Sequence, residues 1–298
     1  MLDIVQHLLD SFQQSRPFFL CIVALFSLLI GSFLNVVIYR LPIMMARGWT
    51  QECQEFLAGE PPCLDASTDK TDVFNLSVPR SRCPACGHLI NVFENIPILS
   101  YLWLRGQCAG CHVHISWRYP SIELLTMLLS LVVAWHFGVT WQMLAALVLT
   151  WSLICLSLID YDKMLLPDEI TLPLLWLGLL LNYFTVFVDL ESAVLGAMFG
   201  YLSLWGMYHL FRIVTKKHGM GYGDFKLLAV FGAWLGWQPV LLIIILSSFV
   251  GAAIGILLIV LSDHSKNKPI PYGPYLAIAG WISLLYGNDI IHAYLNGL

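Results

Sequence analysis

Eight apolar segments, each long enough or nearly long enough to cross a bilayer, constrain this chain more than any other feature. They predict that most of the chain lies in lipid, in agreement with 58% apolar residues, 11% charged residues and a mean hydropathy of +0.76. The sixth segment is short and rich in glycine, and Asn288 and Asp289 interrupt the last, so a count of seven stays open. The expected fold class is an all-α polytopic membrane protein with about eight transmembrane helices. The segments run roughly over 17–39, 121–137, 141–159, 170–188, 192–213, 225–237, 240–261 and 275–295.

The basic residues predict the orientation of these segments, because Lys and Arg near span ends stay on the cytoplasmic side. If the N-terminus lies outside, all but Arg16 of the 15 Lys and Arg residues are cytoplasmic. Asp3 and Asp10 stand where a signal peptide carries basic residues, and no small-residue cleavage site follows the first apolar run. We therefore expect a multi-pass protein whose first segment is retained.

Three regions follow from this topology: 1–39 with the first transmembrane helix, a cytoplasmic domain over 40–119, and a seven-helix membrane domain over 120–298. The stretch 50–80 is polar and poor in pattern, so a mobile insertion is expected there. Basic and acidic residues balance in the cytoplasmic domain, which argues against a polybasic lipid-binding arm. With a net charge of −4 and a pI near 6.1, the chain offers no basic surface for nucleic acid.

Four cysteines in the cytoplasmic domain have the spacing of a zinc site. Cys83 and Cys86 form one CxxC pair and Cys108 and Cys111 form a second, with 21 residues between the pairs. Each pair lies on a tight turn of the kind that wraps thiolates around a tetrahedral ion. Two disulfides are the alternative, but structural disulfides are rare in reducing cytoplasm.

With four thiolates bound, no coordination position stays open, so the metal is expected to be structural and to fold a domain with little core of its own. The neighbouring histidines His88, His112 and His114 lie close enough in sequence to support or replace a ligand, or to be plain surface residues.

Two aspartates, Asp160 and Asp224, each border an apolar segment, 64 residues apart. A carboxylate beside hydrocarbon is costly and usually has a function or a partner. The predicted topology puts both at the cytoplasmic face. Peptide hydrolysis by two aspartates needs one ionised and one protonated carboxyl group, and like charges held close keep one of them protonated. Which of the two is the base stays open.

Alternatives exist for each aspartate. Asp224 ends a Gly-x-Gly-Asp motif that by itself is also typical of a loop before a helix N-cap. Asp162 and Asp168 compete with Asp160 for the first position. Asp162 lies further from the apolar segment, and Asp168 follows Pro167 before a new apolar run, as an N-cap does. Burial therefore favours Asp160.

Together with several further motifs, the two aspartate motifs resemble those of the type IV prepilin peptidases, bacterial aspartyl proteases of the GxGD class. The two aspartate motifs run from Asp160 to Asp168 and from Gly221 to Phe225. The further motifs are Gly31 to Pro42, the two CxxC pairs, Glu94 to Pro97, Arg118 to Glu123, and Pro271-Tyr-Gly-Pro274-Tyr-Leu.

The resemblance implies an enzyme of the bacterial inner membrane, with a periplasmic N-terminus and a cytoplasmic zinc domain. Such an enzyme cleaves the leader from type IV prepilins and type II secretion pseudopilins, then N-methylates the new N-terminal residue with S-adenosylmethionine. The catalytic aspartates fall on Asp160 and Asp224, and the metal ligands fall on the four cysteines. For the methyl-transfer site, the resemblance leaves only weak candidates in the first cytoplasmic domain. They are Glu94, Asn95, Arg118 and Glu123, which helix-end salt bridges explain about as well.

Two other classes of function compete. A transporter also uses carboxylates on two spans, but there the charges lie at the midplane between inverted repeats, and we find no convincing repeat. A membrane scaffold with a zinc ribbon leaves the second aspartate without a purpose. A soluble-type methyltransferase fold is not expected, because no glycine-rich βα unit is found.

Overall fold

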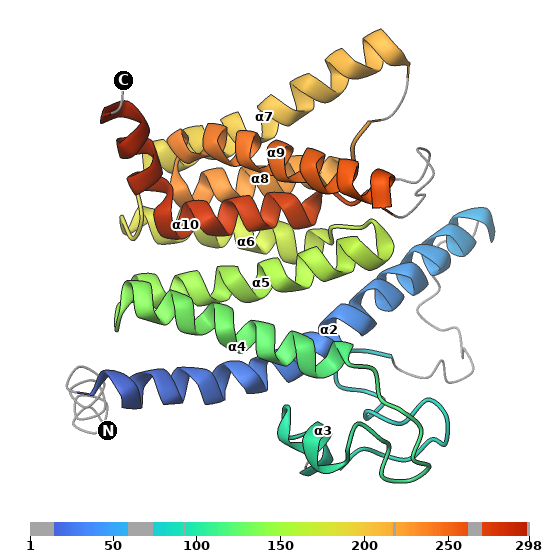
Figure 1. Ribbon diagram of the computed structural model, residues 1–298. Helices are drawn as coiled ribbons and strands as arrows, with labels where there is room; N and C mark the ends of the chain where they lie inside the picture. The colour runs from blue at the N-terminus through green and yellow to red at the C-terminus, as the bar shows by residue number, and fades with distance from the viewer. Residues whose placement is uncertain (1–14, 59–73, 92, 217–218, 262–269, 297–298) are drawn as a thin grey trace. The chain divides into compact units, whose positions relative to one another are not determined.

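The computed structural model describes residues 15–58, 74–91, 93–216, 219–261 and 270–296, and these are helical with short irregular connections. The described residues contain no extended β-strand, only two isolated bridges that pair Arg82 with Leu89 and Gln107 with His114. The chain divides into two compact units, Gln14–Leu131 and Val132–Leu298, each of which is described by itself. All-α architecture is therefore confirmed for the described residues (Figure 1).

The first unit begins with α2, a helix of 43 residues over Arg16–Ala58. It continues with the 3₁₀ helix η1 (Phe93–Asn95), the short α3 (Leu99–Trp103) and the first part of α4 (Arg118–Phe137). α2 and α4 touch closely, since a Cβ on Gly31 would lie 2.8 Å from the Cα of Glu123. Asn35 of α2 also donates a hydrogen bond to the backbone oxygen of Tyr119, at 3.2 Å.

The predicted start of the cytoplasmic domain, residue 40, lies within a helix. α2 does not end where the apolar segment ends but continues through Pro42 to Ala58. The beginning of the stretch 50–80, expected to be a mobile insertion, is therefore helical, and 59–73 lies outside the described residues. Arg40 of α2 donates to the carbonyl oxygens of Asn75 and Pro79, which fixes the returning chain against the helix.

The second unit is a bundle of six helices and the end of α4. It contains α5 (Trp141–Lys163), α6 (Asp168–Tyr183), α7 (Leu190–Thr215), α8 (Tyr222–Leu235), α9 (Gln238–Leu261) and α10 (Gly273–Asn296). α8 contacts α6, α7, α9 and α10, and all of its residues from Leu227 to Leu235 are buried (Figure 1). The core of this unit therefore forms around the helix that begins within the Gly-x-Gly-Asp motif.

Glycines allow α7 and α8 to approach each other. A Cβ on Gly200 would lie 2.7 Å from the backbone oxygen of Leu228, and a Cβ on Gly196 would overlap the backbone of Gly232. At the other end of α8, the indole of Trp234 donates to the oxygen of Leu174 on α6, at 2.8 Å. Backbone contacts and buried polar bonds thus hold α8 in place where side-chain volume is small.

Five of the described helices, α2, α4, α5, α7 and α9, are long and apolar enough to cross a membrane. α6 and α8 contain 16 and 14 residues, which is less than a bilayer normally requires. The eight expected segments each coincide with one helix, but a count of eight membrane crossings stays a prediction.

Candidate active site and metal centre

Asp160 lies in the last turn of α5 and is buried, with 6% of its surface exposed. The helix ends because Met164 adopts a left-handed conformation and returns its N–H to the carbonyl oxygen of Asp160, at 2.8 Å. The carboxylate oxygen Oδ2 accepts a hydrogen bond from the backbone N–H of Gly273, at 3.0 Å. Asp160 is thus held inside the second unit by a residue 113 positions away in the chain.

Asp224 lies in the first turn of α8 and is equally buried, with 6% of its surface exposed. Its Oδ1 atom is enclosed and has no hydrogen-bond partner among the described residues. Gly221, the residue at the N-cap of α8, offers its backbone N–H to the carboxyl group. The charge of Asp160 acts on Asp224, so the two side chains are near enough to interact electrostatically.

Leu166 forms a common wall for the two aspartates. A Cβ placed on Gly223, next to Asp224, would lie 2.7 Å from the Cβ of Leu166. A Cβ on Gly273, which binds Asp160, would lie 3.3 Å from the Cδ2 of Leu166. The backbone segments that hold the two carboxyl groups therefore both lie against one buried leucine.

The competing aspartates lie elsewhere. Asp162 is exposed to solvent. Asp168 is not the N-cap residue expected from the sequence, because Pro167 occupies that position and Asp168 is the first residue of α6. Its carboxylate instead binds Lys226 of α8, with the Nζ atom 2.7 Å from both oxygens. Of these three aspartates, Asp160 is the buried one.

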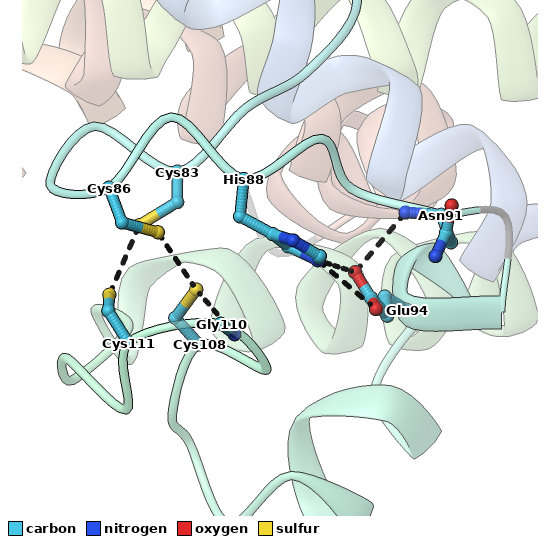
Figure 2. A network of polar contacts seen from close by, with 8 residues as sticks. All are labelled: Cys83, Cys86, His88, Asn91, Glu94, Cys108, Gly110 and Cys111. Atoms are coloured by element: carbon cyan, nitrogen blue, oxygen red, sulfur yellow. Dashed lines mark hydrogen bonds and ion pairs between the residues drawn. The ribbon is translucent and has the colours of Figure 1, made fainter.

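The four cysteines of the first unit converge as their spacing predicts (Figure 2). All four sulfur atoms lie within 4.8 Å of one another, with Cys83 and Cys111 3.8 Å apart and Cys86 and Cys108 3.9 Å apart. These separations are close to the edge of about 3.8 Å that a tetrahedron with Zn–S bonds of about 2.3 Å requires. Each pair lies on an equivalent loop, in which the first cysteine donates its N–H to the residue five positions later, His88 or Val113.

Backbone groups also favour the thiolate form at one position. The N–H groups of Cys86 and Ala85 lower the pKa of Cys83 to about 6. For Cys111 the backbone N–H of Val113 lowers the pKa, but the neighbouring thiols and burial outweigh it and raise the pKa to about 12. Four sulfurs this close cannot all ionise without a cation between them. The donor set therefore fits a divalent metal that prefers thiolates.

His88 links the cysteine cluster to η1 rather than completing it. Its Nε2 atom lies 3.1 Å from Oε2 of Glu94, which also accepts the backbone N–H of Asn91 (Figure 2). The Asn91 N–H and His88 together lower the pKa of Glu94. The other two histidines, His112 and His114, are exposed.

Two of the candidates for methyl transfer have polar contacts within the first unit. Glu94 is occupied by His88 and Asn91, and buried Glu123 accepts the backbone N–H of Ile98 at 2.8 Å. Asn95 and Arg118 are exposed. These contacts do not define a binding site for S-adenosylmethionine, and the four residues stay candidates.

One site residue was not found from the sequence. Gly273 was noted only as part of the Pro-Tyr-Gly-Pro motif, without a role. The signal available was a Gly-Pro pair directly before an apolar run, which marks the first turn of a helix. That signal predicts where α10 begins, but it does not predict that the first N–H of the helix donates a hydrogen bond to Asp160.

Comparisons with known proteins cover nearly the whole chain. Residues 25–137 match the family described as bacterial peptidase A24 N-terminal domain, and 147–256 match the type IV leader peptidase family. The chain is 57% identical over 275 residues to a prepilin leader peptidase/N-methyltransferase of Aeromonas salmonicida, covering 92% of this chain and 93% of the relative. It is 55% identical over 279 residues to the protein of the same name from Pseudomonas aeruginosa, covering 94% of each. No solved structure matches.

Proposed function

Because this chain belongs to the type IV leader peptidase family, we propose that Asp160 and Asp224 are the two carboxyl groups with which it cleaves leader peptides. The chain is a prepilin leader peptidase and N-methyltransferase. The observation that supports the assignment is burial: these two aspartates are each 6% exposed and interact, whereas Asp162 is exposed and Asp168 binds Lys226.

Two buried carboxyl groups near each other can hydrolyse a peptide without a metal or a covalent intermediate. One ionised carboxylate takes a proton from water as the water oxygen bonds to the scissile carbonyl carbon. The other, protonated, carboxyl group gives its proton to the carbonyl oxygen. When the C–N bond breaks, the first carboxyl gives its proton to the leaving amine and the second regains one from the diol, which restores both.

Substrates of this type fit a site at the end of a helix bundle. A prepilin is held in the membrane by an apolar helix, and its cleavage point lies at the boundary of that helix. Asp160 ends a membrane-spanning helix and Asp224 begins α8, so the two carboxyl groups lie at helix ends rather than at the middle of a span. We assign type IV prepilins and type II secretion pseudopilins as substrates, and no nucleic acid.

The four-cysteine cluster is assigned to structural zinc. The sulfur separations support a tetrahedral ion, and four thiolates leave no position for a substrate or a reactive water. The metal joins two loops that have almost no apolar core, so it holds the segment 81–115 together. The cytoplasmic domain over 40–119 is assigned to methyl transfer from S-adenosylmethionine, and 120–298 to proteolysis.

The orientation follows from the charge distribution and the apolar helices. Five helices of the described chain can cross a membrane, and nearly all basic residues fall on one side of the eight-span topology. We assign the protein to the bacterial inner membrane with a periplasmic N-terminus, a cytoplasmic zinc domain and both aspartates at the cytoplasmic face.

One experiment tests the protease assignment. Purified protein in detergent is mixed with a prepilin, and cleavage is followed on a gel for wild type, Asp160→Asn and Asp224→Asn, with Asp168→Asn as the matched control. Both site variants should lose cleavage and the control should keep it. Cleavage retained in either site variant contradicts the assignment.

The same reaction separates the two activities. With labelled S-adenosylmethionine and a substrate that has already been cleaved, methyl transfer should proceed in wild type and in both aspartate variants. Loss of methyl transfer in these variants contradicts the assignment of the two activities to separate sites.

A further inference from the structure

The start of α10 points directly at the candidate active site. Gly273 is the first residue of this helix, and its backbone N–H donates to Oδ2 of Asp160 at 3.0 Å. N–H groups in the first turn of a helix have no partner within the helix, and together they carry a partial positive charge. A carboxylate that accepts such a group is stabilised in its ionised form.

Asp224 also lies in the first turn of a helix and is offered the N–H of Gly221, but one of its oxygens has a different environment. Its Oδ1 is enclosed by protein and has no partner among the described residues. An ionised oxygen buried without a partner carries a large desolvation cost, whereas a protonated one carries much less. The interaction with the charge of Asp160 acts in the same direction. The pair is therefore asymmetric: each carboxyl group is offered one backbone N–H, but Asp224 also has an enclosed oxygen without a partner among the described residues.

The position of Gly273 leaves no room for a side chain. A Cβ there would lie 2.6 Å from Oδ2 and 3.2 Å from Cγ of Asp160. The nearest atoms belong to the Asp160 carboxylate. A larger residue at position 273 would therefore displace the carboxylate that the backbone N–H binds. Leu166, which lies against both Gly273 and Gly223, would transmit part of that displacement toward Asp224.

We propose that Gly273 is a positioning residue whose N–H holds Asp160 as the ionised base, which makes Asp224 the proton donor. This inference rests on the proposed protease function and adds the division of roles. Water gives one proton to Asp160 while its oxygen bonds to the scissile carbon, and the carbonyl oxygen takes the Oδ1 proton of Asp224. As the C–N bond breaks, Asp160 protonates the amine and Asp224 takes back a proton from the diol.

A matched pair of glycine substitutions on α10 tests the positioning role. Gly273→Ala places a methyl group against Asp160, whereas Gly287→Ala meets only ordinary contact with Ser283, at 3.6 Å. For Gly273→Ala we expect kcat for prepilin cleavage to fall about 100-fold, as for misplacement by about 1 Å, with KM nearly unchanged. Methyl transfer and the unfolding temperature should stay at wild-type values, and Gly287→Ala should match wild type throughout.

Two results for Gly273→Ala overturn the positioning role. Normal kcat in Gly273→Ala overturns the positioning role. A parallel loss of cleavage, methyl transfer and thermal stability also overturns it, because this is the pattern of a misfolded protein. If Asp160→Asn or Asp224→Asn still cleaves, the proposed protease site itself is wrong. If both are inactive while Gly273→Ala is fully active, only the present inference is wrong.

The division of roles is tested on the wild-type enzyme with two reagents. A small epoxide alkylates an ionised carboxylate, and a diazo ester alkylates a protonated carboxyl group. Peptide mass spectrometry should locate the epoxide adduct on Asp160 and the diazo adduct on Asp224. In Gly273→Ala the epoxide adduct on Asp160 should decrease. The reverse assignment of the two adducts overturns the proposal.

Discussion

Lys226 binds Asp168 through both carboxylate oxygens, each 2.7 Å from its Nζ atom, and thereby joins the first turns of α8 and α6. Both side chains are partly exposed, at 29% for Lys226 and 49% for Asp168, so the pair should contribute at most about 1 kcal/mol to stability. Asp168→Asn should therefore lower the unfolding temperature only slightly and retain prepilin cleavage. A complete loss of cleavage in this variant would show that Asp168 has a role in the reaction.

A second prediction concerns the buried amide of Asn182. It donates to the carbonyl oxygens of Ala233 and Trp234 at the end of α8, and its own oxygen accepts the N–H groups of Phe187 and Val188. Asn182→Ala leaves several buried backbone groups without a partner, which should cost about 1–3 kcal/mol for each group that stays unpaired.

Thermal unfolding in detergent measures this effect. Exposed Asn288 on α10 provides the control, and Asn288→Ala should leave the unfolding temperature unchanged. Equal unfolding temperatures for Asn182→Ala and wild type would contradict a structural role for the Asn182 bonds.

The close contact of α7 and α8 gives a third prediction. Gly196 faces the backbone of Gly232, whereas Gly206, also on α7, has no neighbour within 4 Å of a built Cβ. Gly206→Ala should be neutral or stabilise by up to about 1 kcal/mol, because alanine favours the helix. Gly196→Ala should destabilise by about 1–3 kcal/mol, because the helices must separate. Equal unfolding temperatures for Gly196→Ala and Gly206→Ala would contradict the close contact between α7 and α8.

Metal removal gives a fourth prediction. The purified protein should contain about one zinc ion per chain, and Cys83→Ser should lower this content, since the remaining three thiolates form an incomplete tetrahedron. Exposed Cys53 lies outside the cluster, so Cys53→Ser should keep the metal. Replacement by cobalt should give the absorption of a tetrahedral thiolate complex. Full zinc content in Cys83→Ser would mean that the metal binds elsewhere.

The orientation can be tested through the same exposed thiol. Cys53 lies on α2 beyond the apolar part of that helix, in the domain assigned to the cytoplasm. A membrane-impermeant maleimide should label Cys53 in permeabilised cells but not in intact spheroplasts, as peptide mass spectrometry would report. Labelling in intact spheroplasts would reverse the topology.

Much of this architecture could be predicted from local patterns. The apolar segments fall on the long helices, and the paired CxxC motifs converge, because both depend on short-range spacing. Burial at the end of an apolar run also separated Asp160 from Asp162, since each residue after the run moves further into water. These features need no knowledge of which helices are neighbours.

Other features depend on neighbours that a single sequence does not reveal. The donor to Asp160 comes from Gly273, on a helix that begins 113 residues later. Asp168 resembles an N-cap residue locally, but it is the first residue of α6 and binds Lys226 from α8. The continuation of α2 past Pro42 was missed because the apolar pattern ends there while helical hydrogen bonding does not. The first two features depend on contacts between residues far apart in the sequence, and the third depends on helical backbone hydrogen bonds.

The enclosure of α8 has a consequence for the position of Asp224. At 14 residues this helix is about 21 Å long, shorter than the hydrocarbon layer of about 30 Å, and most of it touches protein rather than lipid. Insertion by hydrophobicity alone favours its longer neighbours. The contacts of α8 with α6, α7, α9 and α10 therefore hold it in the folded protein where its own length would not. Asp224 lies in the first turn of α8, so this carboxyl group reaches its position near Asp160 only when α8 packs against these helices.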